Sequence, residues 1–121
     1  MHVNESAENY LESILMLSQR LVEVRSIDVA HELNFSKPSV SVAMKNLRES
    51  GCIIMAQSGA ITLTEKGRAI AERTYERHKL LSGWLISLGV AADTAERDAC
   101  MLEHDLSVES FEAIKKAIQK M

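Results

Sequence analysis

Residues 26–51 read SIDVAHELNFSKPSVSVAMKNLRESG, and they carry the strongest indication of the fold. It divides into two short helical segments at Asn34, because Asn is among the few residues other than Gly that accept a positive φ in a tight turn. Ser36 can cap the second segment, Pro38 fits its first turn, and Gly51 can end it. Two short helices joined by such a turn are typical of a helix-turn-helix.

The next segment changes from a helical to an extended pattern. Residues 52–56 and 60–63 are β-prone, and Gly59 lies in the short turn between them. Thr64 can then cap a long helical segment over residues 65–88. A helix-turn-helix followed at once by a small hairpin predicts a winged helix.

The remaining segments are also helical. Residues 6–19 carry an apolar stripe at helical spacing, formed by Tyr10, Ile14 and Leu17. Residues 93–96 indicate a capping box that starts a helix ending near Asp105. Ser107 can cap a last amphipathic helix, whose apolar positions from Val108 to Ile118 we expect to face inward. The pattern predicts a mainly α protein that divides near Thr64, with a DNA-binding type of module over residues 1–64 and an all-helical module over residues 65–121.

Composition limits the class of protein. The chain has 121 residues, 46% of them hydrophobic, with 4% aromatic residues and one Pro, which favours helices over a β-sandwich. Its 14 Lys and Arg against 17 Asp and Glu give a net charge of −3, which on bulk charge alone argues against a nucleic-acid coat or an anionic-membrane partner. The first residues do not resemble a signal peptide, no stretch is apolar enough to span a bilayer, and two Cys do not form a disulfide framework. We therefore expect a cytoplasmic protein.

The outer face of the second short helix is a candidate DNA-binding surface. Its side chains are mostly small or basic, which suits a helix that enters the major groove and grips phosphates. An ordinary solvated helix face is the alternative, and the position between a helix-turn-helix and a hairpin argues against it. The residues that we expect to contact DNA are Ser36, Lys37, Pro38, Ser39, Ser41, Lys45 and Arg48.

Metal-ligand residue types gather in the second half of the chain. Cys100, Glu103 and His104 are spaced i, i+3 and i+4, which places them on one face of a helix. A thiolate, a carboxylate and an imidazole on one face make half of a transition-metal shell. Alone, Cys100 is more often a buried apolar residue and His78 a core histidine. Glu12 lies close to the stripe of the first helix, where a single Glu is usually solvated.

Five segments together resemble the diphtheria-toxin-repressor family of iron- and manganese-dependent transcriptional repressors. The resemblance is to its shorter, manganese-regulator-like form, without an SH3-like domain, and it covers nearly the whole chain. The segments that carry it are SAENYLE at 6–12, SKPSVS at 36–41, TLTEKG at 62–67, RHKLL at 77–81 and CMLEHDLS at 100–107.

The resemblance implies a winged-helix DNA-binding domain followed by a helical domain for metal binding and dimerisation. Its metal ligands map onto Glu12, His78, Cys100, Glu103, His104 and Asn9. The family fills the Cys100 position with Glu in manganese-type members and Cys in iron-type members. It usually fills the Asn9 position with Asp or Met, and an amide oxygen is a weaker ligand than a carboxylate. Ser82 and Glu96 replace the Glu and His of the iron-type ancillary site, which indicates one principal metal site per subunit.

We expect Fe²⁺ or Mn²⁺ in that site, with Zn²⁺ or Co²⁺ as substitutes, because a thiolate shifts preference away from hard Mn²⁺. The predicted function is a metal-dependent transcriptional repressor that binds double-stranded operator DNA as a homodimer. Alternatives are a MarR-like regulator that answers an organic ligand or a redox signal, a metal-buffering protein that does not bind DNA, and a small metalloenzyme. The sequence has neither an H-E-x-x-H motif nor a Gly-rich phosphate loop, so we expect no enzymatic activity and no small-molecule substrate.

Overall fold

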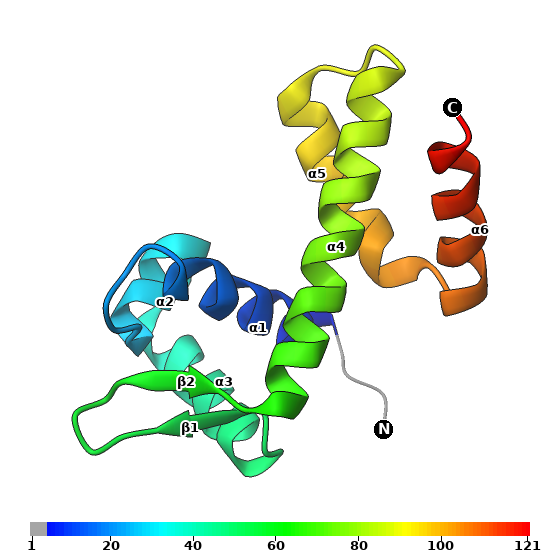
Figure 1. The fold of residues 1–121 in the computed structure, drawn as a ribbon. Helices are drawn as coiled ribbons and strands as arrows, with labels where there is room; N and C mark the ends of the chain where they lie inside the picture. Colours follow the sequence, from blue (N-terminus) through cyan, green and yellow to red (C-terminus); the bar gives the residue numbers. More distant parts are fainter. Residues whose placement is uncertain (1–4) are drawn as a thin grey trace. The chain divides into compact units, whose positions relative to one another are not determined.

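The computed structural model describes residues 5–121, with side chains from Ser6 onward. These residues form six helices and a two-stranded sheet (Figure 1). The elements are α1 (Glu5–Ser18), α2 (Ser26–Leu33), α3 (Lys37–Glu49), β1 (Ile53–Met55), β2 (Ile61–Leu63), α4 (Glu65–Ser87), α5 (Ala92–Asp105) and α6 (Val108–Gln119). The predicted mainly α class and winged-helix order are confirmed. None of the helices over these residues is long and apolar enough to cross a membrane. The start of the chain, on which the signal-peptide prediction rests, lies outside the described residues.

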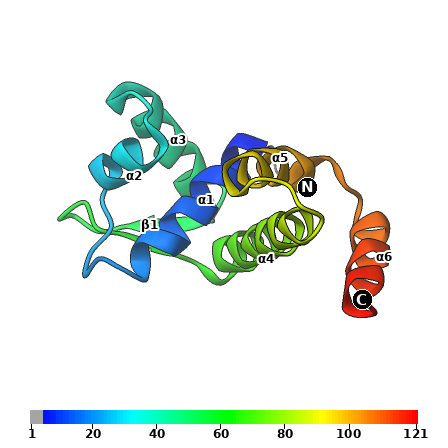
Figure 2. The ribbon, with the colours of Figure 1, turned by 90° about the horizontal axis from the view of Figure 1, so that it is seen from above.

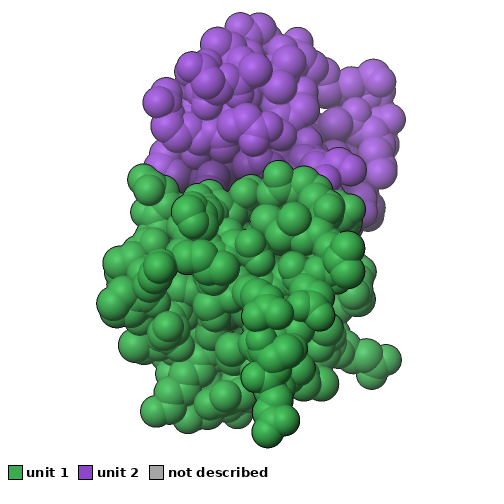
Figure 3. Space-filling view, turned by 90° about the vertical axis from the view of Figure 1, so that its left-hand side faces the viewer, with its two compact units in different colours: residues 1–72 green, residues 73–121 purple. Residues whose placement is uncertain are grey.

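The chain forms two compact units, residues 1–72 and residues 73–121 (Figure 3). The first unit holds α1, the helix-turn-helix of α2 and α3, the hairpin and the start of α4. The second holds the rest of α4 with α5 and α6. The domain boundary predicted at Thr64 lies just before α4, whereas the compact units divide within that helix.

Local signals fix the helix-turn-helix. Asn34 ends α2 in the left-handed conformation, with φ 56° and ψ 44°, as predicted. Ser36 caps α3 by accepting a hydrogen bond from the backbone N–H of Ser39 at 3.3 Å, and Pro38 lies in the first turn. Gly51 follows the end of α3 with φ +80°, a conformation that costs glycine little. The apolar faces of the two helices bury Val29, Ala30, Val40, Met44 and Leu47.

The hairpin is antiparallel, and Ile54 pairs with Thr62 at its centre. Gly59 turns the chain with φ +92°, as the sequence predicts for the wing. A third short segment joins the sheet, because Ile61 donates a backbone hydrogen bond of 2.7 Å to the carbonyl of Val24. Sequence patterns do not predict this bridge, since a single paired residue carries no periodicity.

A side chain also contacts the wing. The Arg25 guanidinium donates to the Ser58 carbonyl at 2.7 Å.

The beginning of α4 is tied to the chain that enters the wing. The Thr64 hydroxyl caps the helix by accepting from the N–H of Gly67 at 3.1 Å, and it donates to the Gly51 carbonyl at 2.6 Å. A Cβ atom at Gly67 would lie 2.0 Å from the carbonyl oxygen of Cys52, far inside contact distance. Glycine at this position therefore allows α4 to pack directly on the backbone before β1.

In the second unit, α5 lies beside α4 (Figure 2). The capping box predicted at residues 93–96 is wrong: α5 begins at Ala92, the Asp93 carboxylate accepts only from the N–H of Thr94 next to it, and Glu96 bonds His78 instead. The box fails because the helix starts before Asp93, so that residue cannot serve as its cap.

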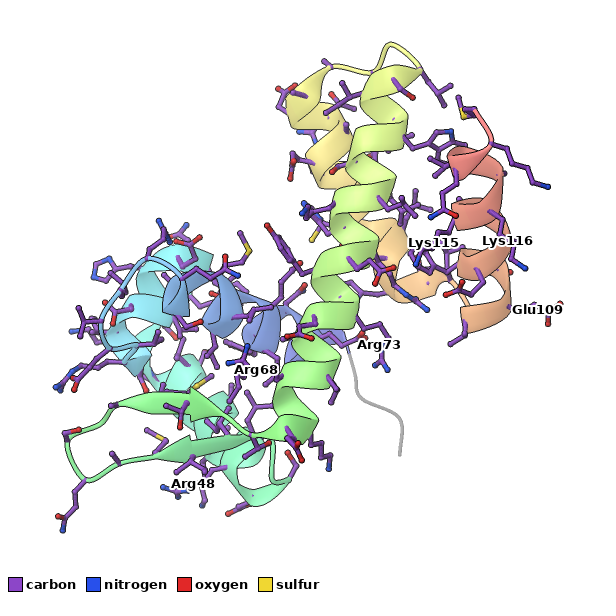
Figure 4. The ribbon with its side chains drawn as sticks, viewed as in Figure 1. Arg48, Arg68, Arg73, Glu109, Lys115 and Lys116 are labelled. Carbon is purple, nitrogen blue, oxygen red and sulfur yellow. The ribbon has the colours of Figure 1, made fainter. Side chains whose placement is uncertain are left out.

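The last helix begins as predicted, with the Ser107 hydroxyl accepting from the Ser110 N–H at 3.1 Å. Phe111 is the buried residue of this helix. Val108, expected to face inward, is 64% exposed, because it is the first residue of the helix and extends beyond the packed face. Lys115 lies on the same helix (Figure 4). Its Nζ atom donates to Glu76 of α4 at 2.7 Å, and this hydrogen bond raises the pKa of Lys115.

Candidate functional site

The candidate metal centre lies near the end of α5. Cys100, Glu103 and His104 each offer one ligand atom, and these three atoms lie within 4.8 Å of one another. The helical rise and twist produce this grouping, since residues i, i+3 and i+4 share a face. The structure therefore brings together the thiol, the carboxylate and the imidazole that the sequence spacing predicts on one face of this helix.

Glu103 is the most buried member of the centre. Its residue surface is 1% exposed, and its Oε1 atom, which makes no hydrogen bond, lies 3.3 Å from Nε2 of His104. Its other oxygen, Oε2, lies 3.0 Å from Nδ1 of His78, within hydrogen-bond distance. Burying a carboxylate is costly unless opposite charge or a metal compensates it. The position of Glu103 therefore suits a bound cation.

His78 reaches the centre from α4. Its side chain is 20% exposed and its ring lies between two carboxylates. Nδ1 faces Glu103, while Nε2 is 2.6 Å from Oε2 of Glu96. The family resemblance implies a metal-binding role for His78, and no contact between His78 and Glu96 is predicted.

The donor set fits a divalent transition metal. Thiolate, carboxylate and two imidazoles are ligands that Fe²⁺, Co²⁺ and Zn²⁺ accept, and the buried carboxylate oxygen of Glu103 supplies a place for positive charge. Cys100 is half-buried and forms no disulfide, and its sulfur is one of the grouped ligand atoms.

Two further predicted ligands come from α1. Glu12 and Asn9 lie three residues apart on α1, in the first unit, and both are half-buried. Their participation stays a prediction. Ser82 is buried on α4, where its hydroxyl donates to the Lys79 carbonyl at 3.3 Å.

Arg77 is a buried cation whose role the sequence does not predict. It is 8% exposed, and its Nη1 atom donates to the backbone carbonyls of Glu103 at 3.0 Å and Leu106 at 2.9 Å. Its guanidinium also lies 4.8 Å from the ring centre of Phe111. A single sequence contains no signal for this role, because Arg77 follows the same helical pattern as the exposed arginines of α4.

The candidate nucleic-acid interface is the outer face of α3, to which Arg48 belongs (Figure 4). All the residues predicted to contact DNA are exposed: Ser36, Lys37, Pro38, Ser39, Ser41, Lys45 and Arg48. Within the described part of the chain, the ion pairs do not engage the three cations of this face. The side chains of Lys37, Lys45 and Arg48 can therefore contact phosphates. Phe35, just before the cap, is 49% exposed and packs edge-on against Tyr10, with ring centres 5.8 Å apart.

Comparison with known families matches both halves of the chain. Residues 2–61 match the N-terminal DNA-binding domain of iron-dependent repressors, and residues 64–121 match the metal-binding and dimerisation domain of the same proteins. The transcriptional regulator MntR of Escherichia coli O6:H1 is 34% identical over 98% of this chain and 77% of its own length. An uncharacterised HTH-type transcriptional regulator of Methanocaldococcus jannaschii is 33% identical over 98% of this chain and 96% of its own length.

Solved structures show the same fold. The manganese regulator SloR has a TM-score of 0.84 and 29% identity, over 98% of this chain. A manganese-dependent transcriptional repressor in complex with manganese has a TM-score of 0.85 and 29% identity, over 93% of this chain. The chain spans about half of the length of these two structures, 55% and 52%.

These findings confirm the resemblance and the predicted class of function, and they give no support to a MarR-like regulator. The chain belongs to the iron-dependent repressor family of metal-dependent, DNA-binding transcriptional regulators.

Proposed function

We propose that this protein represses transcription by binding operator DNA as a homodimer when one divalent transition metal ion occupies each chain. This proposal rests on the grouping of ligand atoms from Cys100, Glu103 and His104, in which the Glu103 carboxylate is buried. The full ligand set that we propose is Glu12, His78, Cys100, Glu103 and His104, with Asn9 as a neutral additional donor. When bound, the ion supplies positive charge and fixes the mutual placement of its ligands.

The ion that we propose is Fe²⁺ or Mn²⁺. Relatives of this chain are manganese regulators by name, which favours Mn²⁺. The Cys100 sulfur favours softer ions, so Zn²⁺ and Co²⁺ act as competent substitutes.

DNA binding uses the outer face of α3. Lys37, Lys45 and Arg48 contact phosphates, which fixes the register of the helix on the duplex. Ser39 and Ser41 lie near the start of the helix, where recognition helices contact base edges. A homodimer repeats this arrangement on two half-sites, so the operator is a near-palindrome.

Metal binding also explains how a protein with a negative net charge can bind DNA. The net charge is −3, and the centre includes acidic groups whose charge a divalent cation offsets. A protein that binds DNA weakly without metal and more tightly with it is consistent with this balance. We place the protein in the cytoplasm with its operator, and assign it no enzymatic activity and no small-molecule substrate.

Selection of DNA from a random pool tests this proposal without knowledge of the operator. The full-length protein is used with Mn²⁺, with Fe²⁺ under anaerobic conditions, and with a chelator. A palindromic sequence enriched only in the metal arms supports the proposal. Equal enrichment in the chelator arm, or no enrichment in any arm, contradicts it.

A further inference from the structure

We infer that Glu96 is a positioning residue for the metal centre, which holds the His78 ring so that Nδ1 faces the cation site. This inference rests on the proposed metal-binding function and adds a residue to it. The observation behind it is the His78 ring fixed at both nitrogens, with Nε2 2.6 Å from Glu96 and Nδ1 3.0 Å from Glu103.

The chemistry of the two partners orients the ring. A carboxylate accepts hydrogen bonds, so Nε2 donates its hydrogen to Glu96. When a cation is bound the ring is neutral, so the lone pair then belongs to Nδ1, the nitrogen that faces the buried Glu103 carboxylate. Histidines that bind metals almost always donate their other N–H to a carboxylate, a carbonyl or a water, and this contact sets the tautomer and strengthens the ligand.

The position of Glu96 on α5 separates it from the ligands themselves. It lies one turn before Cys100, on the stripe that continues to Glu103. Its side chain is 57% exposed, whereas that of Glu103 is fully buried. Glu96 also contacts the ring nitrogen on the side away from Glu103. It is therefore placed to orient a ligand and not to share the ion that Nδ1 binds.

A role in helix capping does not explain the contact. The helix begins at Ala92, so Glu96 lies in its second turn, beyond the free N–H groups of the helix start. An exposed glutamate at such a position loses side-chain entropy when it is held in one rotamer. The short hydrogen bond to His78 is the interaction that compensates this loss.

Two substitutions separate orientation from other effects. Glu96→Ala removes the acceptor, while Glu96→Gln keeps an amide oxygen that can still accept from Nε2. Asp93→Asn is the matched control, since it removes one negative charge from the same helix at a residue that bonds Thr94 and not His78. Each protein is titrated with Zn²⁺ against a competing chelator. The ¹H–¹⁵N signals of the His78 imidazole are recorded with and without Zn²⁺.

Glu96→Ala should weaken Zn²⁺ binding about tenfold, the lower end of the effect expected for removing such a partner, because the contact is partly exposed. It should also remove the hydrogen-bonded Nε2–H signal in the metal-free protein and change the ring nitrogen that binds Zn²⁺. Glu96→Gln should stay within about threefold of the original protein and keep the Nε2–H signal, because an amide acceptor replaces most of the contact. Asp93→Asn should change neither readout.

Three results would overturn the inference. The first is a Glu96→Ala protein with unchanged affinity and an unchanged Nε2–H signal. The second is an equal loss of affinity in Asp93→Asn, which would assign the effect to charge alone. The third is a chain that binds two ions and loses one in Glu96→Ala, which would make Glu96 a ligand. Failure of the proposed function gives a different result, namely a protein that binds no metal. The Nε2–H signal of the metal-free protein then still shows whether Glu96 orients the ring.

Discussion

The Nη1 atom of Arg77 donates a hydrogen bond of 3.0 Å to the backbone carbonyl of Glu103, the most buried residue of the metal centre. The same atom donates to the carbonyl of Leu106 at 2.9 Å, where the chain leaves α5. The guanidinium also lies against the Phe111 ring of α6. Arg77 therefore joins α4 to the end of the ligand-bearing helix and to the last helix.

Arg77→Met should lower the free energy of unfolding of the metal-free protein by roughly 2–4 kcal/mol, because it leaves two carbonyls without their donor and removes a cation–π contact. Denaturant unfolding measures the change. Arg73→Met is the matched control, since Arg73 is exposed one turn earlier on α4 (Figure 4), and it should stay within about 0.5 kcal/mol of the original protein. Equal losses in the two variants would show that Arg77 has no special role.

Gly67→Ala should destabilise the first unit by several kcal/mol, because the new Cβ would lie 2.0 Å from the Cys52 carbonyl oxygen and force α4 away from it. The matched control is Gly83→Ala in the same helix, where a Cβ meets no atom within 4 Å. That change should stabilise the helix by about 0.5–1 kcal/mol, since Ala has the higher helix propensity. Thermal unfolding of both variants measures the difference. A Gly67→Ala protein as stable as the original would show that α4 does not need this close approach.

Cys100→Ala should remove the metal response, because it deletes a ligand of the proposed site. Cys100→Glu is the informative partner, since a carboxylate restores a donor that suits hard ions. It should raise the affinity for Mn²⁺ relative to Zn²⁺ in competition against a chelator. Unchanged metal-dependent DNA binding in Cys100→Ala, or an unchanged order of metals in Cys100→Glu, would remove this residue from the ligand set.

Lys45→Ala and Arg48→Ala should each weaken DNA binding by a similar factor for all sequences and lower the slope of log affinity against log salt by about 1, as expected for phosphate contacts. Fluorescence anisotropy at several salt concentrations measures both quantities. Lys116→Ala on α6 (Figure 4) serves as the control for loss of a positive charge away from α3. A salt slope that falls equally in the control would place the DNA contacts elsewhere.

Much of the fold could be predicted because its boundaries depend on local chemistry. A positive φ at Asn34, a hydroxyl cap at Ser36 and glycine turns at Gly51 and Gly59 all act within a few residues of the chain. The ligand group on α5 was predictable for the same reason, since helical spacing alone puts Cys100 beside Glu103 and His104.

Contacts between distant segments could not be predicted in this way. Glu96 had the spacing of a capping box, yet it bonds His78, which lies 18 residues earlier in the chain. Arg77 bonds carbonyls 26 and 29 residues later, and such partners leave no trace in a single sequence. Hydrogen bonds of this kind are set by how the helices pack, and not by the residues next to them.

Coupling between metal binding and DNA binding can be measured with the purified protein. The affinity for a selected DNA duplex is titrated with Mn²⁺, Fe²⁺ or Zn²⁺ while the bound metal per chain is counted. We predict that affinity rises about 5- to 150-fold, the usual range of coupling between two sites, as one ion binds per chain. Equal affinity for the duplex in the metal-free and the metal-loaded protein would show that metal binding does not control DNA binding.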